Sequence, residues 1–217
     1  MPNDQAGFER SVDFAEASRS IDLSLGYAAY EADLRRQGSQ VLRRMGQRMR
    51  KMGREIGLLE LCESRQTADL TQLAQWKREA CRVKGWPNLY DRPGTSAIYA
   101  ELRAREDREL RGRLFLLNAG EQAVAGIFAL QSDSAWHAWK VAHDPAMARY
   151  SPGMASFVML AQQAEELGIE TLDLSRGDER FKQELGNRSS IVWEGHCGGS
   201  WLSRSVRRVW LEGKRRI

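Results

Sequence analysis

The feature that most constrains the fold of this chain is a run of turn, helix, strand and second turn between residues 148 and 182. Ser151 is a good N-cap, Pro152 suits the first position of a helix, and Gly153 leaves the first helical turn almost bare. Such a start exposes backbone N–H groups and the positive end of the helix dipole, which together favour an anion such as phosphate. The same start occurs in many helices that bind nothing, so this interpretation depends on the apolar strand and the Arg-Gly-Asp-Glu turn that follow.

The sequence around this run predicts a mixed α/β fold. Periodic apolar residues predict helices from Thr67 to about Val83 and from Thr95 to about Leu110. Apolar segments bounded by turn residues predict strands at 58–62, 113–117, 123–130, 135–142, around Leu172 and at 190–194, with a turn or short helix at 178–186. The helix between the fourth and fifth of these strands predicts one βαβ crossover.

The N-terminal part is patterned differently. Residues 1–20 are polar, and we expect a flexible lead. Residues 21–55 are predicted to form a basic amphipathic helical segment, as one helix or a pair, with Gly38 and Gly46 as weak points. Its cations indicate a solvated face or a binding surface, but they alternate with Gly and Gln without interleaved aromatics, so nucleic acid is not the expected partner. Residues 56–198 then form the α/β domain, and 199–217 a basic C-terminal helix.

Composition excludes several classes of protein. The 217 residues are 42% hydrophobic and 29% charged, which suits one globular domain. No run approaches the ~18 apolar residues of a membrane span, and the N-terminus lacks the basic and apolar regions of a secretory signal. The three cysteines and three histidines are dispersed without metal-ligand spacing. We therefore expect reduced thiols, a cytoplasmic location and no metal site.

Two motifs carry a family resemblance. Tyr150-Ser-Pro-Gly153, followed about twenty residues later by Leu172-Asp-Leu-Ser-Arg-Gly-Asp-Glu-Arg-Phe-Lys182, resembles the core of the CelD-like acetyltransferases. These are GNAT-superfamily proteins associated with cellulose and exopolysaccharide biosynthesis, and distant relatives of the Fem-type peptidoglycan aminoacyltransferases. The resemblance runs from about Ile21 to Trp201. It implies a GNAT-like acyl-CoA N-acyltransferase fold, with a mixed, mostly antiparallel sheet flanked by helices and an N-terminal helical extension.

The chain departs from the family pattern at two points. The family usually has Tyr-Lys where this chain has Phe181-Lys182, so a phenolic hydroxyl is missing there. The usual superfamily pattern of a basic or Gln residue with two glycines is reduced to Gly153, with Arg149 as the nearby cation.

The resemblance implies transfer of an acyl group, most simply from acetyl-CoA, to an amine or hydroxyl of a sugar or polysaccharide precursor. No Ser, His or Cys motif offers a nucleophile, so we expect direct transfer. The alternatives are a Fem-like aminoacyltransferase that uses charged tRNA and a GNAT-like binding module without activity. Family members are often longer, which leaves this chain as a fragment, a short variant or half of a homodimer.

The resemblance also selects the residues that would hold the acyl-CoA donor. The donor's phosphates are expected against the first helical turn, with the workable amides from Gly153 onward because proline has no N–H group. The expected cofactor-binding residues are Arg149, Tyr150, Ser151, Gly153, Met154, Ala155 and Ser156.

The second motif supplies the candidate catalytic residues. Asp173 is the leading candidate for an acid–base or substrate-orienting role, and its place between two leucines predicts a raised pKa; the structural alternative is that it caps a neighbouring turn. Asp178, Glu179 and Lys182 are expected to converge after Gly177, where Lys182 contacts a phosphate or sugar hydroxyl, or forms an exposed i, i+3 pair with Glu179.

Candidate substrate-binding residues lie on loops. The segment 85–94 is rich in Pro, Gly and aromatic residues, and we interpret it either as a substrate lip or as a connector held by aromatic packing. The expected substrate-binding residues are Trp86, Tyr90 and Arg176.

Overall fold

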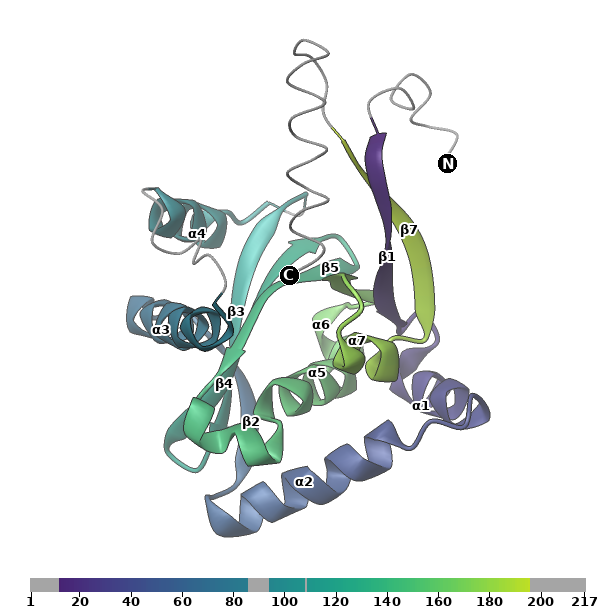
Figure 1. Cartoon of the computed structure of the whole chain (residues 1–217). Coiled ribbons are helices and arrows are strands. Elements are labelled where there is room, and N and C mark those ends of the chain that lie inside the picture. Colours follow the sequence, from purple (N-terminus) through teal and green to yellow (C-terminus); the bar gives the residue numbers. More distant parts are fainter. Residues whose placement is uncertain (1–11, 86–93, 108, 196–217) are drawn as a thin grey trace.

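A seven-stranded, mostly antiparallel sheet flanked by helices forms the centre of the computed structural model, which describes residues 12–85, 94–107 and 109–195 (Figure 1). The strand order is β2-β3-β4-β5-β6-β1-β7, and β5 with β6 is the parallel pair among antiparallel neighbours. The strands are β1 (Val12–Asp22), β2 (Leu59–Ser64), β3 (Arg111–Ala119), β4 (Gln122–Ser132), β5 (Ala135–His143), β6 (Thr171–Arg176) and β7 (Arg188–Gly195). The predicted fold class, the meander and the crossover are confirmed.

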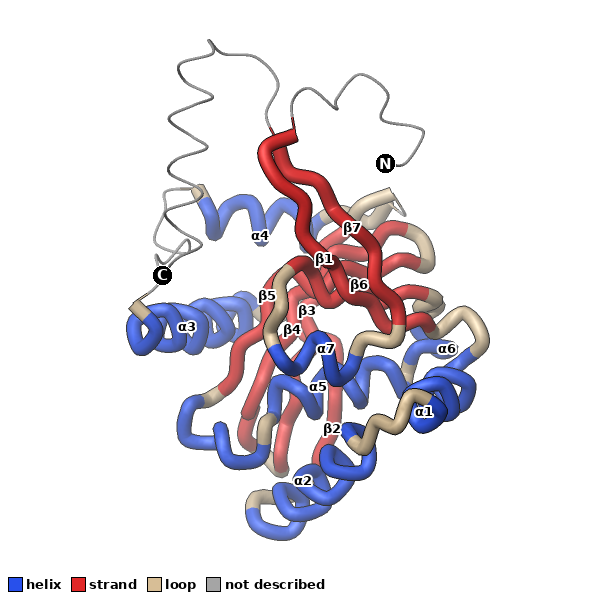
Figure 2. Tube along the Cα trace, turned by 45° about the vertical axis from the view of Figure 1, so that its right-hand side comes forward, coloured by secondary structure: helices blue, strands red, loops and turns tan. Residues whose placement is uncertain are grey.

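Helices cover both faces of the sheet (Figures 1 and 2). On one face α3 and α4 pack against β5 and β3, and on the other α5 packs against β4 and is itself covered by α2. The helices are α1 (Gly26–Arg36), α2 (Val41–Glu55), α3 (Thr67–Lys84), α4 (Thr95–Ala104), the 3-10 helix η4 (Pro145–Tyr150), α5 (Pro152–Gln162), α6 (Ala164–Leu167) and α7 (Arg180–Leu185). None of the described helices is long and apolar enough to cross a membrane.

The two faces of β3 bury separate apolar clusters. Phe115 and Leu117 pack on the α5 side with Trp136 and Phe157, whereas Leu114 and Leu116 pack on the side of α3 and α4. This two-sided burial explains why 113–117 reads as a continuous apolar run rather than an alternating one.

Strand β1 corrects the expectation of a flexible lead at residues 1–20. Residues 12–20 belong to an inner strand that pairs with β6 on one side and with β7 on the other. The strand partners of β1 lie 149 to 183 residues later in the chain, so the local sequence of β1 does not indicate them. Residues 1–11 lie outside the described part.

The segment 21–55 also differs in detail from the expectation. Its first two residues end β1, and the rest forms the helices α1 and α2. Gly38 lies between the two helices with φ of +76°, which a glycine adopts without strain, whereas Gly46 lies inside α2. The helix that begins at Thr95 ends at Ala104 rather than Leu110. The predicted C-terminal helix at 199–217 lies outside the described residues.

Candidate functional site

The two parallel strands separate at His137 and Asp173. Strands β5 and β6 pair through Ala135↔Thr171, Trp136↔Leu172 and His137↔Asp173, and their pairing ends there. Beyond this point β5 continues to His143 and leads through η4 into α5, while β6 ends at Arg176. The result is a fork in the sheet that opens toward the start of α5, and the His137–Asp173 pair lies at its apex.

A network of hydrogen bonds fixes Asp173 at this apex. Its Oδ2 lies 2.7 Å from Nδ1 of His137, and its Oδ1 accepts hydrogen bonds from the Ser18 hydroxyl at 3.0 Å and the Ser175 backbone N–H at 2.8 Å. His137 and Asp173 keep 34% and 37% of their side-chain surface exposed, so a substrate can reach them. The network therefore joins β5, β6 and β1 while leaving the imidazole accessible.

The expected raised pKa of Asp173 is wrong. Burial by itself raises the pKa of this carboxyl, but the hydrogen bond from His137, the Ser175 N–H group, the charge of His137 and the Ser18 hydroxyl together hold it below its usual value. An ionised Asp173 can only accept a hydrogen bond, so Nδ1–H of His137 donates to it, and in the neutral tautomer with this proton Nε2 is an acceptor.

Sequence reasoning missed His137 and Ser18 as site residues. His137 is 36 residues from Asp173 and Ser18 is 155 residues away. A histidine on one of two strands joined by a crossover was the one available signal. Strand register, which brings it opposite Asp173, cannot be read from either strand alone.

The start of α5 is built from Ser151, Pro152 and Gly153. Ser151 occupies the N-cap position and Pro152 the first turn, as predicted, but Ser151 has left-handed backbone angles (φ +56°, ψ +52°) and its side chain makes no capping hydrogen bond. Its hydroxyl instead accepts a hydrogen bond from the Arg48 guanidinium of α2. Gly153 lies against β5, where an added Cβ would be 3.7 Å from both His143 and Val141.

Several expected donor-binding side chains are occupied within the protein. Tyr150 is buried, and its hydroxyl bonds to Glu55 of α2 and to the Arg149 guanidinium that stacks over its ring. Ser156 is fully buried and donates to the Pro152 carbonyl at 2.9 Å, and Ala155 is buried as well. The backbone N–H of Ser151 is also used, because it donates to the Ala148 carbonyl at 3.0 Å. Contact with a ligand from these positions is therefore left mainly to the backbone of Gly153 and to the side chain of Met154.

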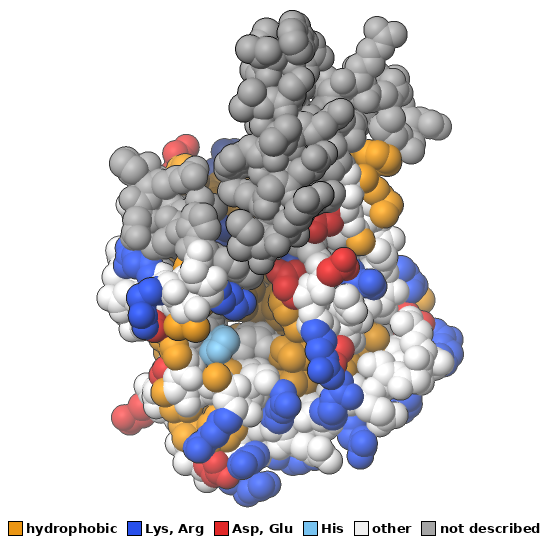
Figure 3. Space-filling view, in the orientation of Figure 1, with side chains coloured by type: hydrophobic (Ala, Val, Ile, Leu, Met, Phe, Trp, Pro, Cys, Tyr) orange, Lys and Arg blue, Asp and Glu red, His pale blue; other side chains and the backbone are white. Residues whose placement is uncertain are grey.

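A basic groove of about 330 Å³ lies beside Met154, between α2, α5 and α7. Three arginines, Arg44, Arg48 and Arg180, and one carboxylate, Glu184, line this groove. Glu184 pairs with Arg180 at 2.8 Å and with Arg44 at 3.1 Å. Figure 3 shows Lys and Arg side chains gathered over this lower part of the molecule, where α2 and α7 lie. The groove therefore carries excess positive charge next to the start of α5.

Two lysines and a histidine lie between α3 and β5. Burial is the main cause that lowers the pKa of Lys77, Lys140 and His143. The positive charge of Lys77 lowers the pKa of the other two further, so the three groups share one region. Because His143 also borders Gly153, this region adjoins the start of α5.

The turn after β6 brings Glu179 and Lys182 together, as predicted. Gly177 has φ of +115°, and an added Cβ would be 2.4 Å from the Glu179 carboxylate, so the turn needs a glycine. Lys182 is 5% exposed, pairs with Glu179 at 2.8 Å and donates to the Arg176 carbonyl. Its ammonium group is therefore committed to holding the turn, and the alternative of an exposed pair is wrong for Lys182.

The other predicted residues lie farther from the fork's network. Asp178 is exposed, with its carbonyl accepting from Gln183 at 3.0 Å, and the exposed Arg176 lies 3.9 Å from Glu16 of β1. Phe181 stacks on Phe157, a packing role that needs no phenolic hydroxyl. Trp86 and Tyr90 lie outside the described residues. Within the described ranges, no group of three or more His, Cys, Asp or Glu side chains could hold a metal ion.

Comparisons with known proteins identify the family of the chain and relate its fold to solved structures. The sequence profile of a family described as acetyltransferase (GNAT) domain matches residues 36–183. Among solved structures, the C-terminal domain (DUF2156) of a putative lysylphosphatidylglycerol synthetase from Agrobacterium fabrum has a TM-score of 0.60 at 13% identity, covering 91% of this chain and 66% of that one. A GCN5-related N-acetyltransferase from Kribbella flavida has a TM-score of 0.43 at 16% identity, covering 67% of this chain and 52% of that one. No curated protein sequence matches the chain.

Proposed function

The chain belongs to the acetyltransferase (GNAT) domain family, and from this premise we propose that it transfers an acyl group, most simply acetyl, from acyl-CoA to an amine or hydroxyl at the fork between β5 and β6. The observation that carries the proposal is the 2.7 Å contact between His137 and Asp173 at the apex of that fork. The chain spans 66% and 52% of the two structures named above, so this proposal concerns the domain alone.

The start of α5 is the proposed site for the donor's phosphates. Three features support it: the positive end of a helix, the Arg48 guanidinium held at Ser151, and the cations Lys77 and Lys140 on the neighbouring side. Cations that are held close together without a bound anion repel one another, so a diphosphate is favoured there by charge. Acetyl-CoA supplies such a group.

His137 is the proposed general base. Its Nε2 takes the proton from the attacking amine or hydroxyl as that atom forms a bond to the thioester carbonyl carbon. The carbon–sulfur bond then breaks, the acyl group stays on the acceptor, and the proton passes to the leaving sulfur, which departs as a thiol. Asp173 acts as a positioning residue, because it holds the imidazole in the required tautomer and stabilises its positive charge.

The proposed acceptor is a sugar or polysaccharide precursor. This part rests on the resemblance of the paired motifs at 150–153 and 172–182 to the CelD-like acetyltransferases. The geometry of the fork requires only an acceptor that loses a proton on acylation, and both amino sugars and sugar hydroxyls meet this requirement.

The test measures thiol release from acetyl-CoA with a panel of amino sugars and neutral sugars, and compares the parent protein with His137→Gln. Glutamine keeps hydrogen-bonding capacity but accepts no proton at neutral pH. We expect kcat to fall by roughly 10²-fold or more, with CoA binding unchanged in calorimetry. Equal turnover of the variant would contradict the assignment of the base. Aminoacyl transfer from charged tRNA without any transfer from acetyl-CoA would contradict the proposed donor.

A further inference from the structure

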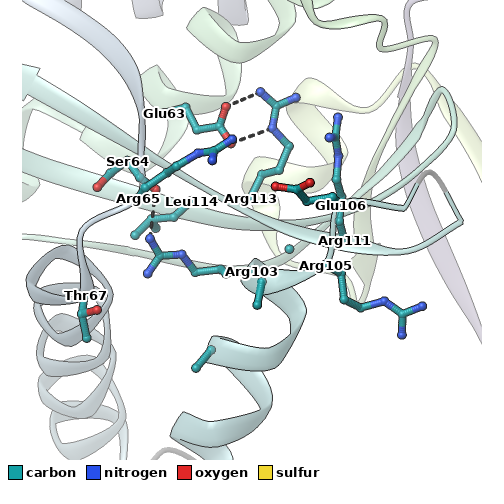
Figure 4. A pocket seen from close by; sticks show the side chains of 13 residues that line it. Glu63, Ser64, Arg65, Thr67, Arg103, Arg105, Glu106, Arg111, Arg113 and Leu114 are labelled. Carbon is teal, nitrogen blue, oxygen red and sulfur yellow. Dashed lines mark hydrogen bonds and ion pairs between the residues drawn. The ribbon is translucent and has the colours of Figure 1, made fainter.

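A second basic pocket lies beside β2 and β3, separated from the fork between β5 and β6 by strand β4. It has a volume of about 420 Å³ and is formed where the end of β2, the start of β3 and α4 meet (Figure 4). Its charged lining is five arginines and two glutamates, namely Arg65, Arg103, Arg105, Arg111, Arg113, Glu63 and Glu106. Strand β4 separates β3 from β5, so the pocket is distinct from the site at His137 and from the start of α5.

Small residues keep this pocket open. An added Cβ at Gly112 would lie 2.5 Å from the Phe128 ring and 3.1 Å from Cβ of Leu102, so a glycine is needed for α4 to lie directly on β3. On α4, Ala100 and Ala104 face the pocket, and their short side chains leave the space unfilled. The close approach of α4 to β3 brings the helix's arginines near those of the strand.

Two of the arginines are neutralised by carboxylates. Arg113 makes a two-pronged ion pair with Glu63, in which Nε donates to Oε1 at 2.9 Å, and the side chain of Arg113 is 13% exposed. Arg105 pairs with Asp107 at 2.8 Å, and Figure 4 shows its side chain directed away from the others. These two arginines contribute little net charge to the space inside.

Neutral acceptors hold two further arginines. Nε of Arg111 donates to the Gln131 side chain at 2.9 Å, and Arg103 donates to the carbonyls of Gln66 and Ser64 at 3.3 and 3.4 Å. Such contacts fix a guanidinium in place without cancelling its charge. Arg65 is exposed and, among the residues that the structure describes, has no hydrogen-bond partner. Even with Glu106 set against one of these three cations, the pocket retains excess positive charge.

We propose that this arginine pocket binds a small phosphorylated molecule, through a diphosphate or two neighbouring phosphates, at a site separate from the acyl donor. Guanidinium groups match phosphate oxygens in two-pronged hydrogen bonds, and pre-positioned arginines lose less side-chain freedom on binding than mobile ones. The volume is several times that of one phosphate group and falls in the range of small-molecule sites. Figure 4 shows Arg65 directly after β2 and Arg103 on α4, on two different walls of the pocket, and they are the ligands expected to bridge the phosphates.

The experiment is calorimetric titration of the full chain with inorganic pyrophosphate at constant ionic strength. Three variants are compared: Arg65→Ala, which removes an exposed side chain; Arg48→Glu, which alters the start of α5; and Arg35→Ala, which removes an exposed arginine of α1 paired with Glu31 at 2.8 Å. We expect Arg65→Ala to weaken pyrophosphate binding about tenfold, the typical effect of one charge-assisted hydrogen bond. Arg35→Ala is expected to leave it unchanged. The pyrophosphate binding that depends on Arg65 is expected to persist when a saturating amount of CoA occupies the start of α5.

Two results would overturn the proposal. One is pyrophosphate binding that is equally tight in Arg65→Ala and the parent protein. The other is binding that CoA displaces and Arg48→Glu abolishes, because the anion would then occupy the start of α5. A protein with no acetyl transfer but with CoA-independent pyrophosphate binding that depends on Arg65 would contradict the proposed function while supporting this pocket.

Discussion

Tyr150, which ends the turn before α5, donates its hydroxyl hydrogen to Glu55 at the end of α2 over 2.5 Å. This bond, together with the contact from Arg48 to Ser151, attaches α2 to the turn that begins α5. The helical segment at 41–55 is therefore part of the wall of the proposed donor site, and its buried face (Val41, Met45 and Met52) packs in the main core. Because this buried face fixes the orientation of α2, the basic face of the helix presents Arg48 to Ser151.

Loss of the Tyr150 hydroxyl is expected to loosen this attachment. In Tyr150→Phe the ring still fills its buried position, but Glu55 and Arg149 lose their shared partner. We expect CoA affinity to fall about fivefold, the typical effect of a residue that acts through a neighbour. Tyr30→Phe is the matched control, because it removes a buried hydroxyl that donates to the Leu185 carbonyl at 2.7 Å. Equal CoA affinities for both variants and the parent would contradict the role of the bond.

Gly153 tests how closely the donor approaches the backbone of α5. An added Cβ would be 3.7 Å from His143 and Val141, which is an ordinary contact, so Gly153→Ala is expected to fold and bind CoA nearly normally. The branched side chain of Gly153→Val adds bulk where a phosphate would meet the N–H groups. We expect it to weaken CoA binding at least about tenfold, measured by fluorescence or calorimetric titration, with the midpoint of thermal unfolding little changed. Unaltered binding in the valine variant would place the donor elsewhere.

Arg48 and Arg43 separate a local role from a general effect of charge. Both lie on α2, but Arg48 contacts Ser151 whereas Arg43 donates to Gln40 at the start of its own helix. We expect Arg48→Glu to weaken CoA binding by about tenfold or more, and Arg43→Glu to change it little, because exposed charges are screened beyond about 10 Å. Titrations at low and physiological salt check this. A similar loss in both variants would favour long-range attraction over a built contact.

Asp173→Asn tests the positioning of His137. The amide of asparagine can donate a hydrogen bond to Nδ1, which would move the imidazole proton to Nε2 and remove the proton acceptor. We expect kcat to fall roughly 10²-fold with little change in donor affinity. The 15N chemical shifts of the His137 ring would report the change of tautomer, and a purely structural role of Asp173 would lower stability without this change.

His143 links pH to stability. Burial, with the charges of Lys84 and Lys77, holds the pKa of His143 below the value of about 6.5 expected in the unfolded chain. Above that pH the imidazole is neutral in both states, and below it the unfolded chain binds the proton first. The free energy of unfolding should therefore fall as the pH decreases from 7 to 5, and fall less in His143→Gln. Denaturant titrations at three pH values measure the difference, and parallel curves for the two proteins would contradict it.

The local sequence was enough to predict the elements that lie next to one another in the chain. The meander at 111–143, the helix start at Ser151-Pro152-Gly153 and the crossover to β6 are each specified by patterns a few residues long. The two motifs were enough to identify the GNAT domain family, because they combine this local structure with unusual residues at fixed spacing. These features depend on backbone preferences and apolar periodicity, which neighbouring residues determine.

Tertiary structure alone decided which side chains meet. Strand β1 was not predicted, because its hydrogen-bonding partners β6 and β7 lie at the other end of the chain. The pairing of His137 with Asp173 depends on the register of two strands, and a shift of one residue would put either side chain on the other face. The pKa of Asp173 follows from that pairing and not from its leucine neighbours. Contacts between residues 36 to 155 positions apart arise from packing the whole sheet, so no short stretch of sequence contains them.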